Sequence, residues 1–277
     1  MSAGSVSEVR PVRPIWRQWN LISNFGRRDL KAKFSGSLLG FTWSLVVPLA
    51  SLGIYTVIFS IVFRVAPPAL GNGRDGIFAL WLFAGLVLWS FFSSTVNAGI
   101  GGLLGAGPLL QKIFFPAYAP VLGAGLAVGM QSLIELSLLL VVLLVLGNLS
   151  WTWLLVPALL ALFAVFAAGI ATAIAILNVY FRDLAHFVAV GLQLLFYLTP
   201  IIYTPEFVPE SWRGIPLRGI VEFSPLSEFL TLFRALVYDL SPGTLVDWAS
   251  VLLWSALALG WASLVYRRRG GDLGEQI

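Results

Sequence analysis

Long uncharged runs alternate with short charged stretches along most of this chain. A helix needs roughly 20 apolar residues to cross ~30 Å of hydrocarbon at ~1.5 Å per residue. Runs of this kind are expected at about Leu38–Phe63, Ile77–Leu104, Val121–Leu146, Trp151–Leu177, Leu184–Tyr203 and Val246–Tyr266. The pattern therefore predicts an all-α polytopic membrane protein with six transmembrane helices.

An amphipathic segment, Ile15–Phe34, precedes the first apolar run. Its apolar residues recur at helical spacing, whereas its basic residues occupy the other side of a helix. Such a helix lies in the membrane interface, with its cations near anionic lipid headgroups. We therefore expect a tail and an interfacial helix at residues 1–37, a transmembrane region at 38–266 and a short tail at 267–277.

The composition supports the membrane assignment and removes several kinds of chemistry. Hydrophobic residues make up 58% of the chain and charged residues 11%, and the mean hydropathy is +0.90, whereas about a quarter of the residues in soluble domains are charged. The chain has no cysteine and a single histidine, His186, so no disulfide, cysteine nucleophile or metal site is expected. The formal charge of +4 is attributed to membrane topology rather than to nucleic-acid binding.

The distribution of cations orients the predicted spans. Twelve lysine and arginine residues lie in the two tails and in the loops on the same side, against five on the opposite side. Cytosolic loops of membrane proteins carry the excess of cations. We therefore expect a protein of the cytoplasmic (inner) membrane with both termini in the cytosol.

The longest segment between two predicted spans follows the fifth apolar run and is expected on the outer side. Residues 204–240 mix carboxylates with apolar stretches at helical spacing, interrupted by Pro216 and Pro225. This mixture predicts two short re-entrant helices that dip part-way into the outer leaflet. Within the fifth span, Pro200 predicts a kink near the outer end, and Asp183 is expected to cap the beginning of the helix.

The loop between the second and third predicted spans combines one cation with aromatic residues in the sequence QKIFFP, bounded by Pro108 and Pro116. This composition predicts a short helix at about residues 109–117 that lies across the cytosolic membrane surface. A helix in that place is suited to contact a partner protein.

Several polar and aromatic residues fall inside the predicted spans. A polar stripe in the second span either packs against other helices or lines a hydrated path, and packing is favoured. An intramembrane carboxylate, Glu135, costs roughly 2.5 kcal/mol or more unless it is protonated, paired or hydrated. It is therefore expected to face protein or water, and both a functional role and a structural hydrogen bond to Gln131 are open.

Mid-span aromatic rings suit stacking on sugars, although many aromatics belong to interfacial belts. The candidates for lining a channel are Ser90, Ser93, Asn97, Trp89, Phe92 and Glu135.

The segments RRDLKAKFSGSLLGFTWSLVVPL, QKIFFP, YFRDLAHF, YLTPIIY and SPLSEFLTLFR occur in this order along the chain. Together they resemble the permease subunit of polysaccharide-exporting ABC transporters, the Wzm and TarG group of the type 2 ABC exporter superfamily. The resemblance extends from about Trp16 to Arg269. It implies that the amphipathic segment is a gate helix, that Leu109–Pro116 is a coupling helix and that Pro200–Arg234 forms an outer gate.

The resemblance also implies partners. Two copies of this chain would join two copies of an ABC ATPase subunit and export a lipid-linked glycan, of O-antigen, teichoic-acid or galactan type, through a channel at the homodimer interface. ATP and Mg²⁺ would bind the ATPase, so this chain is expected to hold no cofactor, to catalyse no reaction and to contact membrane lipids but no nucleic acid. Consistent with this, no GxxxxGK[ST] motif occurs in the sequence.

Individual residues are assigned to these roles by motif. The candidates for binding the phosphate headgroup of a lipid carrier are Arg27, Arg28, Lys31 and Lys33. Positive-inside topology and contact with phospholipids are the alternative explanation of these cations. The residues expected to couple the chain to the ATPase are Gln111, Lys112, Phe114, Phe115 and Pro116. The residues expected at the outer gate are Pro200, Tyr203, Pro225 and Arg234.

Three other functions remain open on the sequence. An exporter of drugs or lipids from the same superfamily would share these features. A membrane-embedded enzyme of polyprenyl-glycan metabolism would need a cluster of reactive side chains, for which the outer carboxylates Glu206, Glu210, Glu222 and Glu228 are the candidates. A passive channel would need no ATPase partner.

Overall fold

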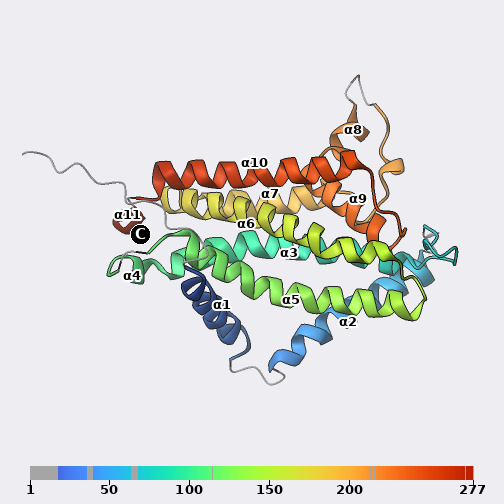
Figure 1. The fold of residues 1–277 in the computed structure, drawn as a ribbon, viewed down its shortest axis with the longest axis horizontal. Coiled ribbons are helices and arrows are strands. Elements are labelled where there is room, and N and C mark those ends of the chain that lie inside the picture. The colour runs from blue at the N-terminus through green and yellow to red at the C-terminus, as the bar shows by residue number, and fades with distance from the viewer. Residues whose placement is uncertain are drawn as a thin grey trace, which may run out of the picture.

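The computed structural model describes residues 18–35, 40–63, 68–113, 115–211, 214, 216–271 and 273–276, and within these ranges all of the secondary structure is helical. The long helices run side by side along the long axis of the molecule (Figure 1). The predicted all-α class is therefore confirmed.

The helices alternate with short turns. They are α1 (Trp19–Phe34), α2 (Trp43–Tyr55), α3 (Phe78–Gly105), α4 (Gly107–Leu110), α5 (Tyr118–Val145), α6 (Val156–Tyr180), α7 (Leu184–Leu198), α8 (Leu217–Glu222), α9 (Pro225–Val237), α10 (Leu245–Arg269) and α11 (Leu273–Gln276). A π-helical stretch, η3 (Thr56–Val62), extends α2. Short 3-10 turns are η2 (Gly40–Thr42), η4 (Trp151–Leu155) and η5 (Pro205–Phe207).

Among the described residues, four helical stretches are long and apolar enough to cross a membrane: α3, α5, α6 with η4, and α10. Two shorter apolar helices, Trp43–Phe59 and Leu184–Leu198, occupy the places of the first and fifth predicted spans. The chain is therefore built as a multi-pass membrane protein, and the count of six spans stays a prediction.

Helix α3 lies at the centre of the bundle and packs against α5, α6 and α9. In its most apolar stretch 67% of the residues are buried, against 17% for α5. Aromatic rings join the central helices, with centroids 4.9 Å apart for Phe163 and Phe229 and 5.7 Å apart for Phe92 and Phe166. Helix α5, in contrast, has one exposed side, which includes Met130, Leu133 and Val141.

The connecting segments gather at two ends of the bundle (Figure 1). One end, here called the α4 end, carries α4, α11 and the last turn of α10, where Tyr180 donates a hydrogen bond to the Arg269 carbonyl. The other, the α9 end, carries α8, α9 and the loops at 68–77 and 146–150. The segments predicted as cytosolic and as outer are thus separated, and which end faces the cytosol stays a prediction.

Two helices begin or end at other residues than expected. Helix α2 begins at Trp43 rather than near Leu38, which lies outside the described residues; Gly40 has φ +51°, a conformation that ends a helical path. Helix α7 ends at Leu198 and does not continue as a kinked helix to Tyr203. The cause is Pro200, because the residue before a proline avoids helical angles, and Thr199 is extended (φ −82°, ψ 135°).

Two local predictions were also wrong in detail. Asp183 does not cap α7 with its side chain; instead its carbonyl accepts from the backbone of His186 and Phe187. The short helix of the second loop is α4, which overlaps only the beginning of the expected range of about 109–117, and residues 111–113 are not helical. Pro108 fits the first turn of a helix, where its missing N–H has no partner to lose. The start of the gate helix expected at Ile15 lies outside the described residues.

Candidate functional site

Helix α1 lies on the first part of α5 at a point where both helices have glycine. A Cβ built on Gly123 would be 2.5 Å from the Cβ of Phe25, 2.9 Å from the Ile22 carbonyl oxygen and 3.0 Å from the Gly26 nitrogen. Ile22 and Phe25 are 2% and 5% exposed. The apolar face predicted for this helix therefore packs on protein at this point, and the glycines allow the close approach of the two backbones.

The loop after α4 joins the same contact. Phe115 is buried, and its ring centroid is 5.6 Å from that of Phe25. The other members of this small cluster are Ile22, Ala106, Tyr118 and Ala119. Phe115 therefore connects the loop to α1 rather than offering its ring to a partner protein, which a sequence pattern of exposed aromatics cannot reveal.

The tip of the loop presents other residues to solvent. Gln111 and Lys112 are exposed, Pro116 is half-buried, and Phe114 lies outside the described residues. Leu109 and Ile113, which sequence reasoning did not select, are 39% and 54% exposed. Their spacing of four was the available signal, because residues i and i+4 share one face of a helical turn. The exposed tip of the loop therefore presents apolar side chains beside one cation, Lys112.

The four cations predicted to bind a headgroup all lie on exposed positions of α1. Arg28 forms an ion pair with Asp29 at 2.8 Å, and its guanidinium lies 5.0 Å from the centre of the Phe25 ring. Exposed ion pairs contribute little to stability. Arg27 and Lys31, which lie one helical turn apart, share a face, and their role stays a prediction.

Glu135 lies beside the junction of α1 and α2. Gln131 donates from Nε2 to the Glu135 carboxylate (3.3 Å) and to the Ser44 carbonyl of α2 (3.2 Å). Lys33 is near enough to act electrostatically on Glu135. The hydrogen bond to Gln131, one of the two interpretations left open by the sequence, is therefore present, and Gln131 joins α5 to α2.

Helix α3 has a polar face that no other described element covers. Ser94, Asn97 and Gly101 are exposed at successive turns, and Ser90 and Ser93 are half-buried beside them. The Ser93 hydroxyl donates to the Trp89 carbonyl (2.9 Å), and the Asn97 amide donates to the Ser93 carbonyl (2.9 Å). Polar side chains at membrane depth normally face protein or water, so this face requires a covering partner or a hydrated path.

The two aromatic lining candidates lie elsewhere on α3. Phe92 is 4% exposed and packs on Phe163 and Phe166, on the opposite side from Asn97. Five residues correspond to about 140° around a helix, which separates the two side chains. Trp89 is half-buried and contacts Phe196 of α7 at 5.4 Å between ring centroids. The structure thus brings Ser90, Ser93 and Asn97 together, without Phe92.

Pro200, Tyr203 and Arg234 meet at the end of α7. The Tyr203 hydroxyl lies 3.1 Å from the Tyr197 carbonyl oxygen and 3.2 Å from that of Leu198, so it satisfies the last turn of the helix. Arg234, in α9, reaches the Pro200 carbonyl. Pro225 lies apart from them in sequence at the first turn of α9, where Ser224 caps the helix.

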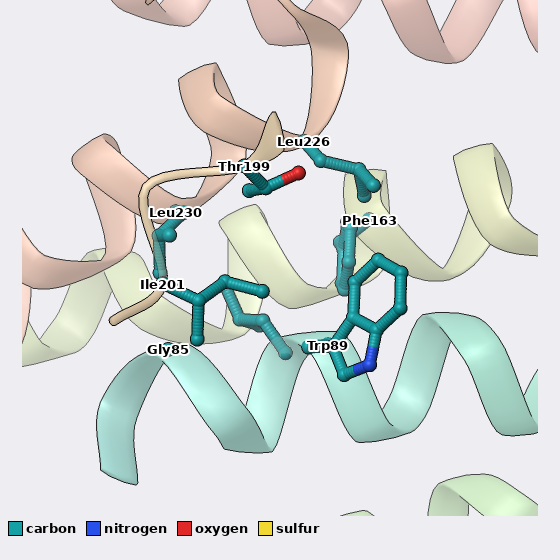
Figure 2. A pocket seen from close by; sticks show the side chains of 8 residues that line it. Gly85, Trp89, Phe163, Thr199, Ile201, Leu226 and Leu230 are labelled. Carbon is teal, nitrogen blue, oxygen red and sulfur yellow. The ribbon is translucent and has the colours of Figure 1, made fainter. Parts of the chain in front are cut away.

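A small pocket lies between this segment and α3 (Figure 2). Its walls are Gly85, Leu88, Trp89, Phe163, Thr199, Ile201, Leu226 and Leu230. Its free volume of about 10 Å³ suits roughly one water molecule. A sugar ring does not fit there in this conformation.

The loops of the α9 end are fastened to the end of α9 by side chains that sequence reasoning missed. Asn148, which is fully buried, donates to the carbonyls of Val237 and Tyr238 and accepts from the Asn72 backbone. The Tyr238 hydroxyl donates to the Pro68 carbonyl (2.9 Å). Burial raises the pKa of Tyr238 to about 12, so the phenol stays a donor at physiological pH.

The outer carboxylates show no arrangement typical of an active site. Glu210 is exposed and pairs with Arg218 at 3.4 Å. A hydrogen bond from Thr204 lowers the pKa of Glu206, whereas burial raises that of Glu228. Within the described ranges, no group of three histidine, aspartate or glutamate side chains is arranged to hold a metal ion.

Comparison with known proteins gives consistent matches along the chain. Residues 21–238 match the family model described as ABC-2 type transporter. The chain is 30% identical over 245 residues to the O-antigen export system permease protein RfbA of Klebsiella pneumoniae, covering 87% of this chain and 88% of that protein. It is also 30% identical over 279 residues to the protein of the same name from Myxococcus xanthus, covering 97% and 100%.

Proposed function

Since the chain belongs to the ABC-2 type transporter family, we propose that it is the membrane subunit of an ATP-driven exporter of a cell-surface polysaccharide. Family membership makes it a transport subunit that works with an ATPase. The observation that carries the choice of substrate is the similarity to O-antigen export permeases over 97% of this chain and 100% of one relative. The substrate is a glycan carried on a lipid.

The α4 end supports a path from ATP hydrolysis to the membrane. The ATPase binds the exposed tip formed by Leu109, Gln111, Lys112 and Ile113. Movement of the tip reaches α1 through the Phe115–Phe25 contact and reaches α3 directly, because α4 follows α3 after one residue. The α4 end then faces the cytosol of the inner membrane, in agreement with the positive-inside rule.

The uncovered polar face of α3 supports a channel between two copies of the chain. Ser94, Asn97 and Gly101 would otherwise face lipid, which is unfavourable for the serine and asparagine side chains. A second copy, related by twofold symmetry, covers this face and leaves a hydrated path for the glycan. Arg27 and Lys31 on α1 attract the phosphate headgroup of the carrier lipid at the cytosolic leaflet.

Copurification with the ATPase tests this function. The chain is expected to copurify from membranes with an ABC ATPase, in equal numbers of the two subunits, and the ATPase rate of the complex is expected to differ from that of the isolated ATPase. If no ATP-binding subunit copurifies, or if its rate is indifferent to this chain, the exporter assignment is wrong.

A further inference from the structure

The segment after α7 is left with backbone carbonyls that its own helix cannot satisfy. Pro200 has no N–H and ends the helix at Leu198. The carbonyls of Pro200 and Ile201 lie beyond this end, and Ile201 is 1% exposed, so water does not reach it freely. Buried carbonyls need partners, and these two receive theirs from a residue more than thirty positions along the chain.

That residue is Arg234 of α9. Its guanidinium donates to the Pro200 carbonyl (2.8 Å), to the Ile201 carbonyl (2.8 Å) and to the Trp81 carbonyl of α3 (3.2 Å). It also stacks on the Trp81 ring, 3.3 Å from the ring centre. Arg234 is 5% exposed. A single side chain therefore fastens the end of α7, α3 and α9 to one another.

The surroundings are shaped for this side chain. A Cβ at Gly85, one turn along α3 from Trp81, would lie 2.6 Å from Nη2 of Arg234, so only glycine leaves room for the guanidinium. In the part of the chain that the structure describes, no carboxylate is within ion-pair distance of Arg234. Carbonyl dipoles and an aromatic face hold the cation directly, and the Asp239 carboxylate acts on it electrostatically from beyond ion-pair distance.

This mode of binding makes the contact reversible. A buried charge that forms no direct ion pair keeps a large part of its desolvation cost, and it regains hydration when the site opens to water. The loss of three hydrogen bonds is then partly offset by solvation of the guanidinium and of the freed carbonyls. A carboxylate partner in the same place would leave two charges to separate.

We propose that Arg234 is the latch of the outer gate: its bonds to Trp81, Pro200 and Ile201 hold the α9 end closed, and they break together when the exporter opens. The latch deepens the exporter function proposed above and rests on it. Arg234 acts as a positioning residue that touches no substrate. Thr199 and Ile201 are walls of the pocket in Figure 2, so release of this segment widens the space beside α3.

The absence of cysteine from the sequence allows a direct test. Thr199→Cys places one thiol on the latched segment, at a position that is 2% exposed. A membrane-impermeant maleimide added outside intact cells is expected to label this thiol slowly. Arg234→Gln in the same background is expected to raise the labelling rate by roughly tenfold or more, because hydrogen bonds of a charged group are each worth about that factor.

Two further variants separate latching from general damage. Gly85→Ala retains Arg234 but displaces its guanidinium, so it is also expected to raise the labelling rate. Arg218→Gln is the matched control: Arg218 lies in α8 at the same end, binds the Val208 carbonyl and pairs with Glu210, but is not part of the latch. It is expected to leave labelling unchanged. The unfolding temperature of each variant reports its folding independently.

The proposal is overturned if folded Arg234→Gln and Gly85→Ala proteins label as slowly as the Thr199→Cys parent, or if Arg218→Gln raises labelling equally. If Arg234→Gln does not fold, Gly85→Ala decides alone. Labelling requires neither ATP nor the ATPase. Fast labelling of the Arg234→Gln and Gly85→Ala variants in a chain that copurifies with no ATPase therefore supports the latch and contradicts the exporter function. Slow labelling of both variants in a chain that does bind the ATPase contradicts the latch only.

Discussion

Replacing Ile113 with aspartate is expected to weaken binding of the ATPase by at least about 30-fold. Ile113 is 54% exposed at the tip of the α4 end and lies next to exposed Lys112. Burying an isoleucine side chain is worth about 2 kcal/mol, which corresponds to roughly 30-fold in Kd. A carboxylate at the same place adds a desolvation cost, so the loss is a lower bound.

The measurement is the affinity of the purified ATPase for this chain in lipid nanodiscs. Ile113→Val is the control, because it keeps an apolar side chain and is expected to change the affinity by less than about fivefold. Since Ile113 is outside the packed clusters of the bundle, the unfolding temperature is expected to stay the same. Equal affinity for Ile113→Asp and the unaltered chain would show that the ATPase binds elsewhere.

Gly123→Ala is expected to loosen α1 from α5. The added Cβ would lie 2.5 Å from the Cβ of Phe25 and 2.9 Å from the Ile22 carbonyl oxygen, closer than atoms in proteins approach. Overpacking of this kind costs about 1–3 kcal/mol, and here the strain falls on the contact that joins α1 to the rest of the chain. Hydrogen exchange of the α1 amides is therefore expected to accelerate by roughly 5- to 150-fold.

Gly125→Ala provides the matched control on the same helix. Its Cβ would meet only a side-chain carbon of Thr95, at an ordinary 3.6 Å, so exchange in α1 is expected to stay as it is. Under the proposed function, Gly123→Ala also lowers transport while the ATPase remains bound, because the tip of the loop is unaltered. Unchanged exchange in α1, or an equal effect of Gly125→Ala, would contradict the importance of this contact.

The helical class, the positions of the apolar helices and the family were predictable from the sequence, because long uncharged runs and proline positions are local signals. The two short helices of residues 204–240 also have local causes, since Pro216 and Pro225 precede or begin α8 and α9. The end of α7 was placed too late because a proline in an apolar run is compatible with either a kink or a stop.

The arrangement of the site was less predictable, because it depends on contacts between distant segments. Arg234 bonds to Trp81, which is 153 residues away in the sequence, and Asn148 bonds to the end of α9, which is 90 residues away. No periodicity connects such pairs. Phe92 and Phe115 were selected as aromatics suited to a substrate or a partner, yet packing against Phe163 and Phe25 buries them. Residue type alone does not distinguish a core aromatic from an exposed one.

The most direct test of the exporter function is transport by the purified complex. This chain and its ATPase, reconstituted in vesicles containing a lipid-linked polysaccharide, are expected to carry the glycan to the opposite side only when ATP is hydrolysed. Ile113→Asp is expected to slow that movement severalfold at an ATPase concentration that just saturates the unaltered chain, because its affinity for the ATPase is at least about 30-fold lower. Movement without ATP, or ATP-dependent movement of simple lipids or dyes while the glycan stays in place, would contradict the proposed function.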